Sequence, residues 1–552
     1  MKSILHKIFS LFSFEEIKTE LKISDQYLWF GSVLLVFIGI YTVYDLQKYA
    51  DILFWDESLY MQKGLQLWKN PSLDWGPLYN VWYKFLSFFT DDKIELYYLN
   101  YKILCILLPL ILFIFLMVYN IHPILSFYVS ILFLYSFINI PIWPKVSHWC
   151  LIVFLSSIIV SRFLRSVYLK FLCVAIGLVL CSYCRPEFYL AYLLFSTCTI
   201  LHLILYKKQY VLLKSVFYAI VLFGLYICVQ FVGNPIKAGG NGRMLITFGQ
   251  HFAFNFCRWN HISDKPFWID WVFYLQENFQ HQSKSVILSN ISHHFLSNIF
   301  NYIKSVLKII TSFAFPLFHS KVNIHSIILT IISIGVLIKF STIKKENLSA
   351  IKSTFRSFSG LLKILLIWCI PTFISSMIAY PRDHYLILQI PFYLLLFVII
   401  VNTLLKIELN IKLFFIIALL LLFAKPFANS FDYFNLLRKE KSLCNFTTAN
   451  YLIQHYKQKE VNVFDFEGNI NSLLPDNFTA NSVDFFTSQS TSVSRYIDSA
   501  KTDIVYITPS LLHSKFTEND TTLKKWLSSP EKYGFTKIKT GNFDAYLLSK
   551  IH

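Results

Sequence analysis

Long apolar blocks recur along this chain, and they decide what it can fold into. Each block runs for roughly 17–22 residues, enough for a helix to cross about 30 Å of hydrocarbon. Only 15% of the 552 residues are charged, whereas a soluble domain carries about 25%. This pattern excludes a disordered chain, a nucleic-acid-binding module and an ordinary soluble enzyme. It predicts a multi-pass α-helical membrane protein.

The apolar blocks predict eleven membrane helices. A charged amphipathic segment, residues 1–28, precedes the first block and is expected on the cytoplasmic surface. That first block is too long for a signal peptide and is predicted to stay as a membrane helix. The segment 303–318, with Lys304 and Lys308, is predicted to lie along the membrane interface. The eleven helices are predicted at 29–45, 99–119, 124–142, 149–161, 169–184, 188–206, 214–232, 324–340, 362–379, 385–401 and 411–427.

The placement of basic residues predicts the orientation of these helices. With the N-terminus in the cytoplasm, the cytoplasmic segments hold 17 Lys/Arg. The short outer connections near 143–148, 185–187 and 380–384 hold one each. Since basic residues gather on the cytoplasmic side, the long segments 46–98 and 233–323 are expected outside. The basic excess indicates contact with anionic membrane lipid rather than with nucleic acid.

Residues 430–552 change in character and predict a small α/β domain on the outer face. Their charge is nearly balanced, with 14 Lys/Arg and 13 Asp/Glu. Short apolar runs suit strands, Gly534 and Gly541 suggest a terminal hairpin, and helical stretches lie between the runs. The predicted strands are 461–466, 503–508 and 544–549, and the predicted helices lie near 445–458 and 520–529. We expect this domain to bind an acceptor or to cover the mouth of a site.

Adjacent acids in the first outer segment form the most informative motif. Asp56 and Glu57 follow the first membrane helix and open a predicted short amphipathic helix. A turn at Trp75-Gly76-Pro77 leads into a second one. Acids at such a place can be helix caps, each contributing about 1 kcal/mol. A carboxylate at the membrane surface can instead accept a proton from a hydroxyl, or hold a divalent ion.

The motif D-E-x-x-Y (Asp56 to Tyr60), followed about 20 residues later by G-P-L-Y (Gly76 to Tyr79), resembles the first outer loop of GT-C glycosyltransferases. The branch it most resembles contains the protein O-mannosyltransferases and the lipid A aminoarabinose transferase. The resemblance implies a GT-C-like fold of about eleven to thirteen membrane helices. It also implies a sugar donor linked to polyprenyl phosphate and a catalytic acid in this loop.

Two outer turns extend the resemblance. The stretch RDHYLILQIPFYLLL starts at Arg382, and family members have a basic, aromatic turn before a helix with a proline. Arg382, with His384, could hold a departing phosphate, because a guanidinium binds phosphate with two hydrogen bonds. The alternative is that Arg382 pairs with Asp383 or reaches lipid headgroups. The turn Arg185-Pro186-Glu187 suits either a substrate contact or a structural ion pair.

One loop departs from the family. Several members carry a second acid between the third and fourth helices, but here PIWPKVSHW has Lys145 and His148 and no carboxylate. This places a bound metal in doubt, so no cofactor is assigned and a divalent ion stays open. Lys145 and His148 could help to neutralise the donor phosphate, or His148 could be structural.

The second long outer segment offers few sharp signals. Its glycine-rich stretch, 234–256, is predicted to be a flexible loop. Further loop contacts to substrate are expected from Tyr60, Tyr79, His148, Arg243 and His251. Asp264, Asp270 and Glu277 are candidates for the missing acid. The pair Cys181 and Cys184 in a membrane helix does not suit zinc or redox chemistry. Cys257 and Cys444 lie outside the predicted helices, where a disulfide is conceivable.

Together these features predict an inverting membrane glycosyltransferase with Asp56 as general base. It would transfer a monosaccharide from a polyprenyl-phosphate donor to a lipid, glycan or protein acceptor. Composition suggests a bacterial inner membrane, with the site on the outer face. The alternatives are a transporter or flippase for lipid-linked sugars, which would carry charges near the bilayer midplane, and an oligosaccharide ligase or polymerase.

Overall fold

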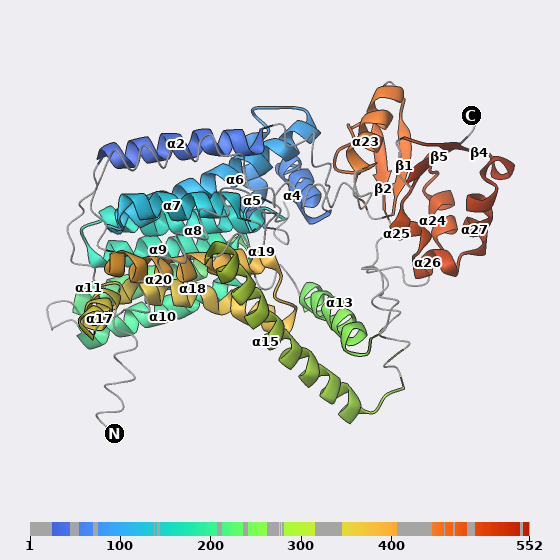
Figure 1. The fold of residues 1–552 in the computed structure, drawn as a ribbon. Coiled ribbons are helices and arrows are strands. Elements are labelled where there is room, and N and C mark those ends of the chain that lie inside the picture. Colours follow the sequence, from blue (N-terminus) through green and yellow to red (C-terminus); the bar gives the residue numbers. More distant parts are fainter. Residues whose placement is uncertain are drawn as a thin grey trace.

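The computed structural model describes most of the chain in two parts, a helical part and a sheet-containing part (Figure 1). The residues that it describes are 25–44, 55–69, 76–136, 138–140, 144–206, 212–235, 241–261, 275, 278, 281–314, 345–405, 444–457, 459–466, 468, 470–482, 492–540 and 545–550.

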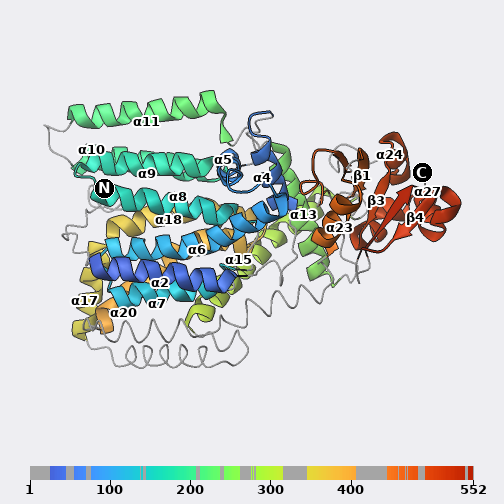
Figure 2. The ribbon, with the colours of Figure 1, turned by 90° about the horizontal axis from the view of Figure 1, so that it is seen from above.

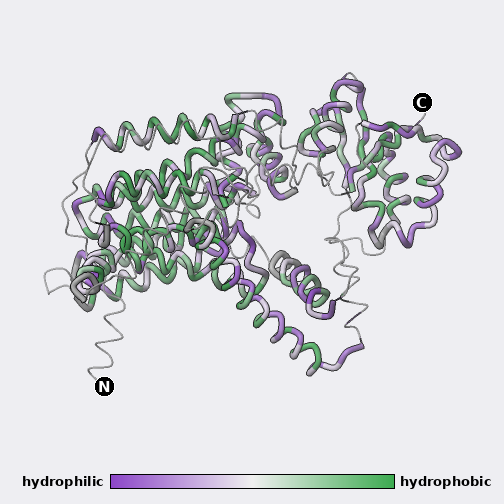
Figure 3. The backbone as a smooth tube through the Cα atoms, in the orientation of Figure 1, coloured by the Kyte–Doolittle hydropathy of each residue, from purple (hydrophilic) through white to green (hydrophobic). Residues whose placement is uncertain are grey.

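The helical part is a bundle of apolar helices lying side by side (Figures 1 and 2). Among the described residues, six helices are long and apolar enough to cross a membrane, and three shorter apolar helices lie among them. In Figure 3 much of the backbone of these helices is green, the colour of hydrophobic residues. The chain is therefore a helical membrane protein. The long helices are α2 (Asp25–Val43), α6 (Lys93–Val118), α8 (Val146–Phe163), α11 (Leu212–Val232), α18 (Ser359–Ile378) and the continuous run α19 (Asp383–Leu386), η3 (Ile387–Gln389) and α20 (Ile390–Leu405); the shorter ones are α7 (Pro123–Tyr135), α9 (Val167–Ser182) and α10 (Phe188–Tyr206).

A described apolar helix lies at nine of the eleven predicted positions. The predicted helices 324–340 and 411–427, and most of the amphipathic segment 1–28, lie outside the described residues. The total of eleven spans therefore stays a prediction. The basic segment after the first of these gaps forms α17 (Lys345–Ser357), which lies at the end of the bundle opposite the sheet (Figure 1).

Short helices gather at the other end of the bundle. α4 (Trp55–Leu65) and α5 (Pro77–Leu86) are the two helices predicted in the first outer segment. Gly76 begins α5 with a φ of +50°, and a Cβ there would lie 2.9 Å from Cε1 of Tyr60 and 3.0 Å from the carbonyl oxygen of Cys184. Only glycine fits so close an approach in the left-handed region.

The second outer segment differs from its prediction. The glycine-rich stretch is not a flexible loop over its whole length, because α13 (Asn241–Trp259) is helical from Asn241 onward. The buried residues of this helix include His251 and Phe252. Residues 303–314 of the predicted helix 303–318 belong to a longer helix, α15 (Lys284–Ala314), and residues 315–318 lie outside the described residues. Asn298 of α15 donates hydrogen bonds to the carbonyl oxygens of Met377 (2.8 Å) and Ala379 (3.0 Å), which fixes α15 against the end of α18.

The C-terminal part is an α/β unit around a five-stranded sheet of order β2-β1-β3-β5-β4. Strands β1, β2 and β3 are parallel, whereas β5 runs antiparallel to β3 and forms the terminal hairpin with β4. Strands β1, β3 and β5 lie at the three predicted strand positions. The elements are α23 (Cys444–His455), β1 (Val461–Asp465), β2 (Phe478–Asn481), α24 (Val493–Ser499), β3 (Ile504–Ile507), α25 (Pro509–Leu512), α26 (Lys515–Glu518), α27 (Thr521–Ser528), η4 (Pro530–Tyr533), β4 (Phe535–Ile538) and β5 (Tyr546–Lys550).

Both faces of this sheet are covered. Along β3, Ile504 and Tyr506 belong to the core that is continuous with the helical bundle. Val505 and Ile507 belong to a separate core with Trp526 of α27. Because side chains alternate along a strand, one face of the sheet packs toward the bundle and the other toward α24 and α27.

Candidate functional site

Three segments distant in sequence meet at the end of the bundle that carries the short helices. The backbone N–H of Leu78 donates to the carbonyl oxygen of Tyr183 (3.2 Å), which joins α5 to the turn between α9 and α10. In that turn, the guanidinium carbon of Arg185 lies 4.5 Å from the ring centre of Tyr385 in α19. The first outer segment and the two outer turns singled out in the sequence therefore form one site.

Glu57 is fully buried and is the centre of a hydrogen-bond network. Its Oε1 accepts from the hydroxyl of Tyr79 (2.6 Å), from that of Tyr83, and from Nδ2 of Asn100 (2.9 Å). Its Oε2 accepts from the backbone N–H of Lys145 (2.6 Å). Burial raises the pKa of Glu57, and the hydrogen bonds from Tyr79, Tyr83 and Lys145 oppose this rise.

This network fits neither role that the sequence suggested for Glu57, which were a helix cap and a carboxylate that accepts a proton from substrate. A helix cap would bond to its own first turn, whereas this carboxylate bonds to α5, to α6 and to the residue before α8. With no exposed surface, it also has no room for a substrate hydroxyl. Glu57 therefore fixes α4 to the helices behind it.

Asp56 differs from its neighbour in exposure. It lies in the first turn of α4 and is partly exposed. No described residue forms a hydrogen bond or an ion pair with its carboxylate. One helical turn later, Tyr60 packs edge-on against Tyr79, with 5.2 Å between ring centres, and lies within electrostatic reach of Arg185. Residues four apart share a helix face, so Asp56 lies on the side of α4 that faces the Arg185 turn.

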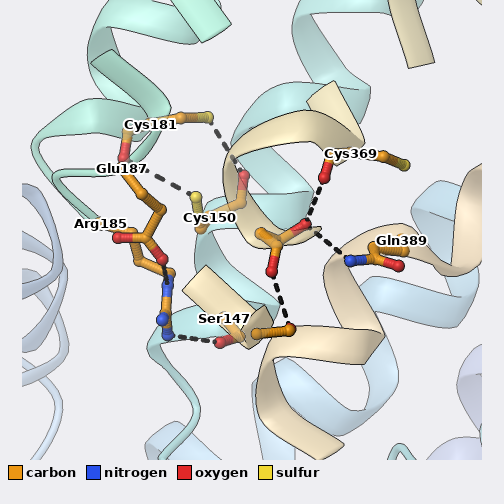
Figure 4. A network of polar contacts seen from close by, with 9 residues as sticks. Ser147, Cys150, Cys181, Arg185, Glu187, Cys369 and Gln389 are labelled. Atoms are coloured by element: carbon orange, nitrogen blue, oxygen red, sulfur yellow. Dashed lines mark hydrogen bonds and ion pairs between the residues drawn. The ribbon is translucent and has the colours of Figure 1, made fainter. Parts of the chain in front are cut away.

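Arg185 is buried, and its position is fixed by two partners (Figure 4). Its Nε donates to Oε1 of Glu187 (2.7 Å) and its Nη1 to the hydroxyl of Ser147 (3.0 Å). The ion pair is the structural alternative considered from the sequence, and it is present. Among the described residues, no further acceptor takes the remaining N–H groups of this guanidinium, which has five in all. The same cation can therefore bind an anion while it is paired.

Stacked rings hold the Arg185 turn in place. Phe188, the first residue of α10, stacks on Trp368 of α18 with 3.8 Å between ring centres. Phe154 of α8 stacks on the same indole, again at 3.8 Å. The indole N–H of Trp368 donates to the carbonyl oxygen of Leu388 (2.6 Å), just beyond α19. One buried tryptophan thus connects the helices that carry both arginine turns.

Arg382 is bound to a histidine rather than to its neighbour Asp383. Its Nε donates to Nε2 of His251 in α13 (2.8 Å), and Nδ1 of His251 donates to the carbonyl oxygen of Thr247 (2.7 Å). Burial and the charge of Arg382 lower the pKa of His251 to about 3, so the ring is neutral. In that form, its lone pair orients the Arg382 guanidinium.

Other groups near Arg382 come from α13 and from the 380–385 turn. Nη1 of Arg258 donates to the hydroxyl of Tyr380 (3.2 Å), whose ring also stacks near His251. His384 lies within electrostatic reach of Arg382, Arg185 and His251. The predicted phosphate-binding residues Arg382, His384 and Arg185 are therefore brought together, and His251 joins them.

Lys145 and His148 point away from this site, so the structure gives no support to their predicted contact with a donor phosphate. Both side chains are fully buried. Nζ of Lys145 donates to the carbonyl oxygens of Asn139 and Ile140 and lies 4.3 Å from the ring centre of Tyr101. Nε2 of His148 bonds to the carbonyl oxygen of Asn139 (3.1 Å). Burial lowers the pKa of Lys145. These two residues support the network under Glu57.

Several other predicted groups lack a described environment. Arg243 lies in α13, but its side chain is outside the described set. Asp264, Asp270 and Glu277 also lie outside the described residues. Within the described ranges, no three His, Cys, Asp or Glu side chains converge on a metal position. Cys181 and Cys184 are buried free thiols. The side chain of Cys444 lies outside the described set, so its pairing with Cys257 stays a prediction.

Sequence reasoning missed two partners of Glu57, Tyr83 and Asn100. A signal for each was present. Tyr83 lies four residues after Tyr79, on the same face of an amphipathic helix. Asn100 is an amide near the start of a mostly apolar block, where a buried polar group needs a partner.

Comparison with known proteins adds no relative: no family model matches the chain, and no curated protein matches it.

Proposed function

We propose that this protein is an integral-membrane glycosyltransferase. It transfers a monosaccharide from a polyprenyl-phosphate donor to a hydroxyl group of a lipid, glycan or protein acceptor. One observation supports the proposal: Asp56 is partly exposed one helical turn before Tyr60, which lies within electrostatic reach of Arg185. Arg185 in turn packs on Tyr385, in the turn that carries Arg382. A base and a phosphate-binding group are the two parts that this reaction needs.

Asp56 acts in the proposal as the general base. The acceptor hydroxyl gives its proton to Asp56 while its oxygen forms a bond to the anomeric carbon of the sugar. The bond from that carbon to the phosphate oxygen breaks, and its electron pair leaves with the polyprenyl phosphate. The displacement occurs in one step and inverts the anomeric centre, through a transition state with oxocarbenium character like that of glycosidases.

Arg382 and Arg185 stabilise the departing phosphate in this scheme. Both are pre-oriented, Arg382 by His251 and Arg185 by Glu187 and Ser147. A guanidinium that is already fixed in place stabilises developing negative charge without reorganising at the moment of reaction. Lys145 and His148 have no part in the scheme, because both are fully buried on another network.

The same proposal includes an orientation. The site and the sheet-containing part lie at the same end of the bundle, and the basic helix α17 lies at the opposite end (Figure 1). Since basic segments favour the cytoplasm, the site would face outward. Eleven spans of a GT-C-like bundle in a bacterial inner membrane fit this orientation, with 324–340 and 411–427 as the two further helices.

The test is sugar transfer by the full-length protein in detergent. Polyprenyl phosphates carrying radiolabelled mannose or aminoarabinose would be incubated with it and with membrane lipid extract. The proposal expects label in a new product together with release of the free polyprenyl phosphate. A transporter or flippase would instead move an intact donor across proteoliposomes without breaking the sugar–phosphate bond, and that result would contradict the proposal.

A further inference from the structure

The first turns of α6 lie between the two parts of the molecule. Asp92 caps this helix, and its Oδ1 accepts from the backbone N–H groups of Ile94 (2.8 Å) and Glu95 (2.9 Å). Capping satisfies donors that would otherwise be unpaired and keeps the helix end ordered. The segment that follows, from Lys93 to Asn100, contacts both the C-terminal part and the Glu57 network.

Toward the C-terminal part, the contacts are aromatic and polar. The ring of Phe446 in α23 lies 5.7 Å from that of Tyr97 and 5.2 Å from that of Tyr98, centre to centre. Nζ of Lys93 donates to the carbonyl oxygen of Leu474, in the turn after β1. Phe446, Tyr97 and Tyr98 are all nearly or fully buried. They belong to one core that continues into the face of the sheet on that side.

Toward the first outer segment, the same turns hold the acid motif. Asn100, three residues after Tyr97, donates through Nδ2 to Oε1 of Glu57 (2.9 Å) and accepts through Oδ1 from the indole N–H of Trp82 (2.8 Å). Tyr97 lies within electrostatic reach of Tyr83, another donor to Glu57. Less than one helical turn of α6, from Tyr97 to Asn100, therefore connects Phe446 with Glu57, the residue next to Asp56.

We propose that the C-terminal part positions the acid-bearing helix α4, and that Phe446 is the positioning residue. Docking of Phe446 on Tyr97 and Tyr98 orders the start of α6. Asn100 then holds Glu57, and Glu57 sets the direction in which Asp56 points. The arginines that would bind phosphate lie on other turns, so their positions do not depend on this contact. The catalytic consequence, though not the mechanical one, rests on the proposed function.

Hydrogen exchange of the full-length protein in detergent tests the mechanical part without any substrate. Phe446→Ala should speed exchange of the α4 backbone by about tenfold, because the variant removes two aromatic contacts. Exchange in β3 should stay slow, and Phe446→Leu should have a smaller effect. Tyr533→Ala is the matched control, since it removes a half-exposed ring from the same part of the molecule, away from α6. Unchanged exchange in α4 with β3 still protected would overturn the proposal.

A second variant covers the case in which Phe446→Ala unfolds the C-terminal part. Tyr98→Ala removes the shorter of the two ring contacts of Phe446 from the α6 side and leaves the sheet intact. It should loosen α4 as well, and protection of α4 equal to that of the unaltered protein would overturn the proposal.

Sugar transfer separates this inference from the proposed function. In an active enzyme, both variants should lower kcat, while KM for the donor changes little. If the unaltered protein transfers no sugar but α4 still loosens, the proposed function fails and the positioning role stands. If transfer occurs and kcat is unaffected by loss of the Phe446 contact, the positioning role fails alone.

Discussion

Nε of Arg382 donates a hydrogen bond of 2.8 Å to Nε2 of His251, although 131 residues separate the two. Nδ1 of the same ring donates to the carbonyl oxygen of Thr247, so Nε2 is the nitrogen that accepts from Arg382. His251 must then stay neutral to accept from Arg382. A neutral, buried histidine beside an arginine has consequences for stability as well as for binding.

The pH dependence of stability should contain a contribution from His251. Its pKa in the folded protein, about 3, lies below the ordinary value of 6.5, so the unfolded chain takes up this proton first as the pH falls. Folding stability is therefore full above pH 6.5 and falls as the pH decreases from about 6.5 towards 3, by up to about 1.4 kcal/mol per pH unit. Melting curves between pH 4 and 8 should show a smaller loss for His251→Gln, whose amide oxygen can still accept from Arg382. Equal slopes for the two proteins would argue against a neutral buried ring.

Glu57→Gln should destabilise the fold. Glutamine keeps one acceptor oxygen, but its NH₂ group would face the backbone N–H of Lys145, and two donors cannot pair. The expected cost is roughly 1–3 kcal/mol, seen as a lower Tm in detergent. Glu95→Gln is the control, because Glu95 is exposed on α6. A Tm equal to that of the unaltered protein would show that Glu57 does not fix α4 to the helices behind it.

Arg185→Lys tests the guanidinium rather than the charge. Lysine has no planar fork, so it cannot hold Glu187 and Ser147 and still present further donors. We expect about tenfold weaker binding of a polyprenyl-phosphate sugar, with little change in Tm. Titration with the donor in detergent measures this affinity. Arg165→Lys, at an exposed position between α8 and α9, should bind as the unaltered protein does. Full affinity in Arg185→Lys would remove Arg185 from donor binding.

Labelling of single cysteines tests the orientation. Lys532 in η4 and Lys352 in α17 are both exposed. η4 lies between α27 and β4 in the chain, and those two elements lie at the opposite end of the molecule from α17 (Figure 1). In intact cells, and in a variant whose ten native cysteines are replaced by serine, a membrane-impermeant maleimide should reach Lys532→Cys and not Lys352→Cys. Labelling of Lys352→Cys alone would show the opposite orientation. Labelling at both positions would show that the chain does not cross the membrane an odd number of times between them.

The sequence predicts the helices of this bundle well because a membrane imposes a length and a composition on each one separately. α6 and α8 could be found from their own residues alone. α13 could not, since its glycines indicate a loop, whereas contacts between His251 and Arg382 fix it as a helix. Local propensity was overridden there by tertiary packing.

The same distinction holds for the candidate site, where some residues could be identified from the sequence alone and others could not. The sequence could point to Asp56, Arg185 and Arg382 as polar groups at the ends of apolar blocks, and the structure brings their segments together. It could not separate Asp56 from Glu57, because adjacent residues on a helix point in different directions, and only packing decides which is buried. The buried position of the Lys145 side chain also depends on the Tyr101 ring in α6, besides the carbonyl oxygen of Asn139 close by in the chain.

In the proposed reaction, Asp56 accepts the proton of the attacking hydroxyl. Asp56→Asn keeps the shape of the side chain and removes the proton acceptor. Turnover of a polyprenyl-phosphate sugar should fall by roughly 10²–10⁴-fold, while the affinity for that donor and the Tm should stay near those of the unaltered protein. Asp91→Asn, at an exposed position just before α6, is the matched control and should retain full activity. Near-normal turnover by folded Asp56→Asn would show that Asp56 is not the general base.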